Sequence, residues 1–273
     1  MTETLVLCAM TLPRASLRER VAAARAGGFQ AISLTTRDYA RARAEGLGDA
    51  EIRALLAGEG IAVTDIEALA AWRPGVEPRR PEQSEDGIFA VAEAVRARGV
   101  SVVEGAGAPL AVGPGAEAFG ALCDRAAARG LRLHIEFWPG SALDLATALA
   151  IVQAVDRPNA GVMVDTWHLA RTPGGEAIVR TLPGARITAV QISDSPSVDG
   201  PEPDYLAAAL GRRLVPGEGG LDLVGFLRLL RDSGCRAPLG VEVCSERLAA
   251  EPAAVVAHRL GDAMRALLRR ARA

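Results

Sequence analysis

The sequence predicts an α/β protein in which residues 1–273 form one domain, a single (β/α)₈ barrel. Short apolar stretches alternate with amphipathic stretches rich in Ala, Arg and Glu, and the alternation repeats eight times. Such alternation builds a parallel sheet covered by helices, and eight units close it into a barrel. The length of 273 residues is close to the ~250 typical of that fold. The rival, an open doubly wound sheet, lacks its G-x-G-x-x-G turn here.

The order of the elements follows from the apolar stretches. The expected strands are 4–10, 30–36, 61–69, 100–106, 131–137, 160–166, 187–194 and 238–244. The expected helices lie around 16–27, 49–59, 84–98, 116–129, 142–154, 174–181, 222–233 and 250–271. Several of these helices are followed by glycine, which favours a left-handed C-cap. Two long loops, 70–87 and 195–220, follow strands, so both are expected at the carboxyl rim, where such barrels keep their active sites.

Composition excludes several classes of function. A net charge of −2 gives no electrostatic reason to expect nucleic acid or a membrane surface as partner. All 31 basic residues are arginine, which excludes Schiff-base chemistry on a lysine. The N-terminal MTETLVLCAM does not resemble an export signal, and the four cysteines form no close pair, so we expect a reduced cytoplasmic protein.

Polar side chains end four successive strands. Glu136, Asp165, Gln191 and Glu242 each stand inside an otherwise apolar run, at the carboxyl ends of strands five to eight. Their neighbours Ile135, Val164, Val190 and Val241 are aliphatic. Because side chains alternate across a strand, the aliphatic residues should face the helices and the polar ones the barrel interior.

Three carboxylates that converge inside a barrel repel one another and are costly to bury. A divalent cation makes such a cluster tolerable. Three carboxylates and one amide oxygen form a hard, all-oxygen set, which favours Mg²⁺ or Mn²⁺, with Co²⁺ and Zn²⁺ as further options. Unrelated buried polar residues, each paired with nearby backbone or arginine, are the alternative interpretation.

The order E…D-x-x-H…Q…E on strands five to eight resembles the xylose-isomerase-like barrel superfamily of sugar phosphate isomerases and epimerases. The similarity is strongest from about 131 to 246 and includes PGEGGLDLVGFLRLLRDSG. The resemblance implies that Glu136, Asp165, Gln191 and Glu242 bind one divalent metal and that His168 contacts a substrate oxygen beside it. It also implies a homodimer or homotetramer.

Two features depart from the ketose epimerases of that superfamily. Epimerases commonly carry histidine where this chain has Gln191, and glutamine is more like the 3-dehydroshikimate dehydratase branch. The arginine that epimerases place shortly after this ligand is missing from QISDSPSVDG. Dehydration therefore stays open beside isomerisation and epimerisation.

The predicted chemistry is proton abstraction next to a metal-bound carbonyl of a small polyhydroxylated substrate. Glu136 and Glu242 are the candidate proton carriers, and His168 is a candidate acid. Further candidate substrate contacts are Glu67, Arg171 and Trp138, and Arg212 or Arg213 could also meet an anionic group.

Isomerase or epimerase is the first prediction, and a dehydratase of the 3-dehydroshikimate or inosose type is the second. A non-catalytic sugar-binding barrel is a different class, which a protein without metal would favour. A hydrolase that activates water on the same metal needs the same ligands.

Overall fold

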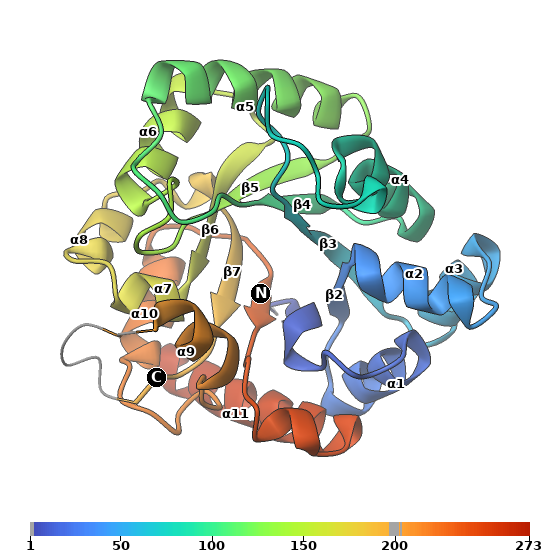
Figure 1. Ribbon diagram of the computed structural model, residues 1–273. Helices are drawn as coiled ribbons and strands as arrows, with labels where there is room; N and C mark the ends of the chain where they lie inside the picture. The colour runs from blue at the N-terminus through green and yellow to red at the C-terminus, as the bar shows by residue number, and fades with distance from the viewer. Residues whose placement is uncertain (1–2, 197–201, 203) are drawn as a thin grey trace.

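The computed structural model describes residues 3–196, 202 and 204–273. Eight parallel strands form a closed barrel in sequence order, with the helices outside it (Figure 1). The strands are β1 (Leu5–Leu7), β2 (Ala31–Thr35), β3 (Ala62–Leu69), β4 (Gly99–Val102), β5 (Arg132–Glu136), β6 (Ala160–Asp165), β7 (Ile187–Ile192) and β8 (Leu239–Val241). All eight predicted strands are confirmed, although several are shorter than expected because the chain turns away at the rim.

Eight of the helices correspond to those predicted, and three were not expected. The predicted ones are α1 (Leu17–Gly27), α3 (Asp49–Gly58), α4 (Glu85–Val95), α5 (Val112–Ala127), α6 (Leu145–Val155), α8 (Gly175–Arg180), α10 (Leu223–Asp232) and α11 (Ala253–Arg272). The others are α2 (Thr36–Ala44), α7 (Thr166–Ala170) and α9 (Tyr205–Gly211). The segment 195–220, expected as a loop, therefore contains a helix, while its residues 197–201 and 203 lie outside the described residues.

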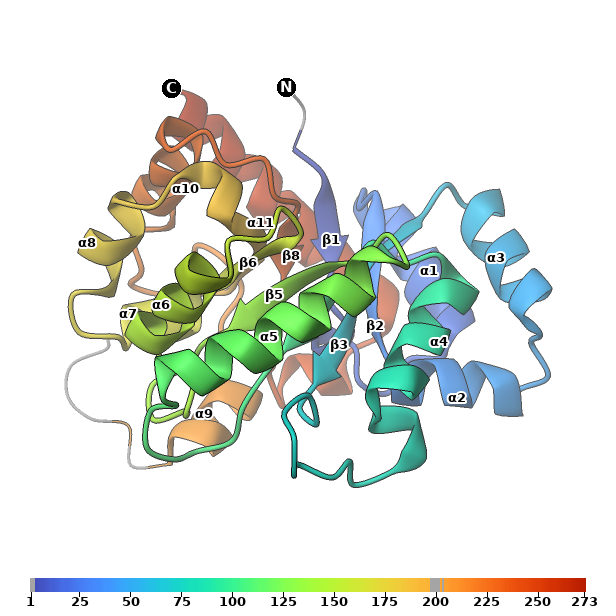
Figure 2. The ribbon, with the colours of Figure 1, turned by 90° about the horizontal axis from the view of Figure 1, so that it is seen from above.

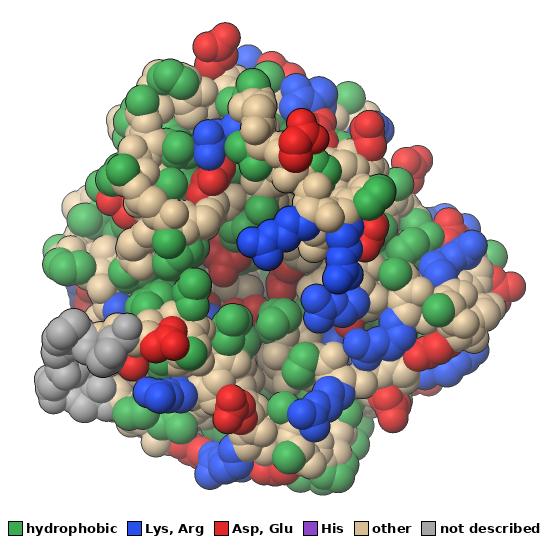
Figure 3. All heavy atoms as spheres, in the orientation of Figure 1, with side chains coloured by type: hydrophobic (Ala, Val, Ile, Leu, Met, Phe, Trp, Pro, Cys, Tyr) green, Lys and Arg blue, Asp and Glu red, His purple; other side chains and the backbone are tan. Residues whose placement is uncertain are grey.

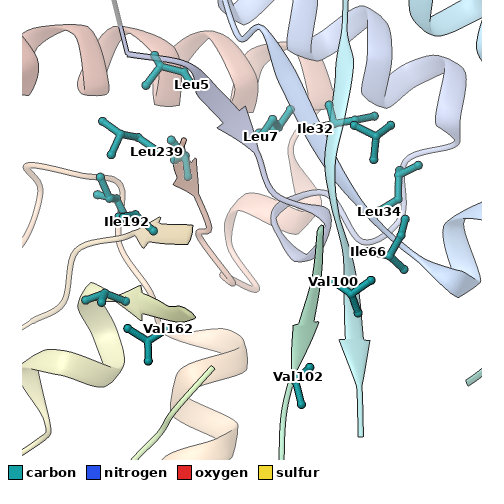
Figure 4. Close-up of a cluster of buried hydrophobic side chains, with 14 of the residues drawn as sticks. Leu5, Leu7, Ile32, Leu34, Ile66, Val100, Val102, Val162, Ile192 and Leu239 are labelled. Carbon is teal, nitrogen blue, oxygen red and sulfur yellow. The ribbon is translucent and has the colours of Figure 1, made fainter. Parts of the chain in front are cut away.

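The main core lies between the sheet and the helices. Ile135, Val164, Val190 and Val241, predicted to face the helices, are no more than 2 % exposed. Figure 4 shows similar aliphatic side chains from neighbouring strands. Burying each such side chain contributes ~1.5–3 kcal/mol relative to exposure, so the alternation of apolar and polar residues fixes which face of each strand turns outward.

The barrel interior carries a buried polar pair below the rim. His134 donates or accepts through Nε2 at 2.6 Å from Asp65 Oδ1, and its Nδ1 lies 3.0 Å from Thr188 Oγ1. His134 is thus an interior hydrogen-bonding residue. Gly99, which follows the predicted helix 84–98, does not cap that helix but lies in β4, where a Cβ would stand 2.5 Å from both Asp65 Oδ1 and His134 Nε2. Arg96 ends that helix in a left-handed conformation.

The two ends of the chain lie on the side opposite α9 (Figure 2). In the same view (Figure 2) β1 runs away from the chain ends, so the carboxyl ends of the parallel strands lie on the side of α9. In the part of the chain that the structure describes, no helix is both long and apolar enough to cross a bilayer.

Candidate active site

The four polar residues predicted to bind metal do meet at one rim. Glu136 and Asp165 end β5 and β6, Gln191 lies near the end of β7, and Glu242 directly follows β8. Gln191 Nε2 donates a hydrogen bond to Glu242 Oε1 at 3.0 Å. Oxygens of Glu136 and Asp165 and a ring nitrogen of His168 lie within 4.8 Å of one another, close enough to hold one metal ion.

Asp165 explains the D-x-x-H spacing. Its Oδ1 accepts hydrogen bonds from the backbone N–H of Trp167 at 2.6 Å and of His168 at 3.4 Å, so it caps α7. A helix that starts directly at the strand end turns His168 back over the rim. There His168 Nε2 lies 3.7 Å from Glu136 Oε1 and 3.9 Å from Asp165 Oδ2.

Arg213 enters the site from the segment between α9 and α10. Its Nη1 lies 2.6 Å from Asp165 Oδ2 and 3.1 Å from Glu242 Oε2, and its Nε donates to the Ala209 carbonyl. Burial alone would lower the pKa of Arg213, but the neighbouring Asp165 and Glu242 raise it well above its ordinary value. Burial also opposes ionisation of Asp165, yet Arg213 and His168 keep the pKa of that carboxyl low. The guanidinium thus links two of the predicted metal ligands.

Tyr205, on α9, was not predicted to belong to the site. Its hydroxyl is hydrogen-bonded to His168 Nδ1, and its ring stacks on Trp138 with centroids 5.8 Å apart. Burial, followed by the negative charge of Asp165, raises the pKa of Tyr205, so the phenol keeps its proton. The only signal in the sequence was an aromatic residue in a long rim loop, which does not reveal where the loop folds.

The remaining sequence candidates divide between the cavity and its surroundings. Glu67 and Trp138 line a cavity of about 290 Å³ at the rim, together with Glu136, His168 and Glu242. Arg171 is not among the lining residues: its guanidinium lies 3.5 Å from the Trp167 ring and donates to Ser195 Oγ. Arg171 therefore packs on Trp167 outside the cavity lining, and its predicted contact with substrate stays a prediction.

The cavity is strongly acidic at its floor. Burial raises the pKa of Glu67 to about 8, with a further contribution from Glu136. Burial likewise raises the pKa of Glu242 well above its ordinary value, although Arg213 acts in the opposite direction. In Figure 3 acidic side chains lie at the bottom of a hollow in the middle of this face, with arginine and apolar side chains around its edge. One guanidinium does not balance Glu67, Glu136, Asp165 and Glu242 when all four are ionised.

This donor set fits a divalent cation. The carboxylates outnumber the positive charge among them, and Gln191 Oε1, a buried atom, has no hydrogen-bond partner among the described residues. An amide oxygen left without a donor in a buried acidic cluster is a site for a cation. Asp165 and Glu242, which Arg213 contacts, would be among the residues that hold the cation.

Fold and site together define a (β/α)₈ barrel with an acidic, metal-compatible centre at the carboxyl rim. The chain belongs to the xylose isomerase-like TIM barrel family, whose profile matches residues 21–267. A curated 3-dehydroshikimate dehydratase from Pseudomonas aeruginosa is 35 % identical over 133 residues, which are 48 % of this chain and 20 % of that protein. The chain thus matches about a fifth of that relative's length.

Solved structures share the whole fold at low sequence identity. A xylose isomerase-like TIM barrel/4-hydroxyphenylpyruvate dioxygenase fusion protein superposes with a TM-score of 0.83 at 23 % identity, covering 98 % of this chain and 42 % of that one. The IolI protein, described with a bound zinc atom, gives a TM-score of 0.83 at 17 % identity, covering 97 % of this chain and 98 % of that one. These likenesses establish the barrel.

Proposed function

We propose that this chain is a divalent-metal-dependent enzyme that removes a proton next to a carbonyl group of a small polyhydroxylated substrate. The observation that carries the proposal is a rim cavity lined by Glu136 and Glu242, with Asp165 close to Glu136 and Gln191 hydrogen-bonded to Glu242. These four residues are the proposed metal ligands. The bound cation would supply Lewis acidity at the substrate carbonyl oxygen.

Glu136 is the proposed base. Glu242 is held by Gln191 and Arg213, whereas Glu136 has only His168 Nε2, at 3.7 Å, as an ionisable partner among the described residues. Glu136 also lines the cavity, so its carboxylate can reach a substrate C–H bond there. A base in that position takes the proton, and the electron pair of the C–H bond moves toward the carbonyl.

Dehydration is the outcome we favour. The 35 % identical relative is named a 3-dehydroshikimate dehydratase, and Gln191 resembles that branch. His168 lies beside Glu136 and is hydrogen-bonded to Tyr205, so it is placed to protonate a leaving hydroxyl. The base takes one proton, the acid gives one, and the β-hydroxyl departs as water with formation of a C=C bond.

Epimerisation or isomerisation is the second candidate. Glu136 and Glu242 come from β5 and from the end of β8, so they approach the cavity from different strands. Two carboxylates on different sides of a planar intermediate can remove a proton from one face and return it to the other. His168 would then orient a substrate oxygen.

Turnover of 3-dehydroshikimate and of free ketoses by the metal-loaded protein in D₂O tests these outcomes. Dehydration creates a new conjugated chromophore, whereas epimerisation places deuterium on the reacting carbon without water loss. Glu136→Gln should lower kcat at least ~10²-fold, while the exposed Glu117→Gln should match the wild type. Full activity of Glu136→Gln would remove the mechanism. Binding of sugars without turnover, and without any effect of Mn²⁺ or Mg²⁺, would instead identify a non-catalytic barrel.

A further inference from the structure

A second group of potential metal ligands lies beside the proposed centre. Cys8 Sγ and carboxylate oxygens of Glu67 and Glu242 are within 4.8 Å of one another. Cys8 and Glu242 are buried, and Glu67 is partly buried. The three residues come from the ends of β1, β3 and β8, which are far apart in sequence, so closure of the barrel brings them together.

A small cavity of about 10 Å³ adjoins this group. Cys8, Glu67, Ser33 and Gln191 are among the residues lining it. Gly240 leaves room there, because a Cβ on that residue would stand 2.7 Å from Cys8 Sγ and 3.6 Å from Gln191 Cγ. The space is close to the smallest that holds one water molecule or ion.

Gln191, one of the residues that line this cavity, also carries an unsatisfied acceptor. Gln191 is 2 % exposed and its Oε1 has no partner among the described residues, while its Nε2 donates to Glu242. A buried amide oxygen without a donor is costly. The proposed function assigns that oxygen to the first cation, and a second cation held by Cys8, Glu67 and Glu242 would share it.

We infer that Cys8, Glu67 and Glu242 hold a second divalent cation, with Glu242 shared between the two positions. Paired metal sites commonly place their ions ~3.5–4 Å apart. Since thiolate is a soft ligand, this position favours Zn²⁺ or Co²⁺ over Mg²⁺. Glu67 lines both cavities, so an ion bound there lies against the wall of the active-site cavity. The inference rests on the proposed function only through Glu242 and Gln191.

Cobalt provides the test, because a thiolate bound to Co²⁺ gives a near-ultraviolet charge-transfer band and carboxylates do not. Metal-free protein is titrated with Co²⁺, and stoichiometry and absorption are recorded together. The wild type should bind two ions per chain and show the band. Cys8→Ser should bind one ion and lose the band, and Glu67→Gln should lose the second ion while the fold survives.

Cys235→Ser is the matched control, since Cys235 is a free, half-buried thiol near the start of β8, lining a different cavity. It should keep both ions and the band. A wild type that binds a single ion without the band would overturn the second site and leave the proposed function intact. A band that survives in Cys8→Ser would overturn it equally. Binding of no ion at all would remove both proposals.

Discussion

Among the described residues two arginines are buried, and their surroundings differ. Arg20, on α1, donates to the carbonyls of Ala9 and Leu12 at 2.7 and 3.0 Å and to Asp38 Oδ1 at 3.1 Å. Arg213 instead joins Asp165 and Glu242 at the floor of the rim cavity. Arg20 is 0 % exposed and Arg213 is 3 % exposed, so burial does not distinguish them.

Charge balance distinguishes the two. Around Arg20 one guanidinium meets one carboxylate, so the charges balance. Its two terminal nitrogens donate to Asp38 and to two backbone carbonyls, which ties α1 to α2 and to the β1–α1 loop, and its Nε has no partner among the described residues. Around Arg213 the carboxyl groups outnumber the guanidinium, which is the arrangement that the proposed metal site requires. A balanced buried pair indicates a structural role, and a surplus of one charge indicates a binding site.

Arg20→Met should give the largest change in stability. Removal of the guanidinium leaves Asp38 buried without its partner, which costs about 3–5 kcal/mol in the free energy of unfolding. For a chain of this length that is a decrease in Tm of roughly 6–20 °C. Thermal and urea unfolding measure it. The kcat/KM of the folded variant should equal that of the wild type, and a specific loss of kcat would contradict the structural role.

Arg213→Met should lower catalytic activity, which Arg20→Met should leave unchanged. We expect kcat to fall about 10²–10³-fold, as for other lost charge stabilisers in active sites. Because Asp165 and Glu242 are proposed metal ligands, Mn²⁺ should restore most of the lost free energy of unfolding. Mn²⁺ should not restore that of Arg20→Met. Equal rescue of both variants, or of neither, would break the distinction between a balanced and an unbalanced cluster.

The sequence predicts the residues at the strand ends of this molecule better than it predicts the buried arginines. Glu136, Asp165, Gln191 and Glu242 could be placed from the sequence because strand alternation and parallel direction bring successive strand ends to one rim. Arg213 could not be singled out among many arginines, because it follows a long segment whose path depends on tertiary contacts. α2, α7 and α9 were missed for a related reason.

Each of these three unexpected helices is short, between five and nine residues, and lies beside a strand end or in a rim loop. Their apolar period is too brief to be recognised, and capping by Thr35, Asp165 and Asp204 sets where they start. Long periodic stretches of sequence therefore predict the barrel. The position of α9 depends on tertiary contacts, which the local sequence pattern does not reveal.

Tyr205→Phe tests the contribution of α9 to the unbalanced cluster. The variant keeps the ring that stacks on Trp138 and loses only the hydrogen bond to His168 Nδ1. One such bond contributes about 0.5–1.5 kcal/mol, so kcat should fall up to roughly tenfold. KM and Tm should stay near the wild-type values. A change in KM alone would indicate that the hydroxyl contacts substrate and does not position His168.

Arg43→Met should give the smallest effect and complete the comparison. Arg43 Nη1 lies 3.1 Å from Asp49 Oδ1, the same distance that separates Arg20 from Asp38, but the two side chains are 48 % and 42 % exposed. Water solvates both charges when the contact is lost, so the free energy of unfolding should change by less than about 1 kcal/mol. Urea unfolding at low and high salt measures it, with Arg20→Met in parallel. A loss as large as that of Arg20→Met would show that the contact distance, and not burial, sets the strength of these pairs.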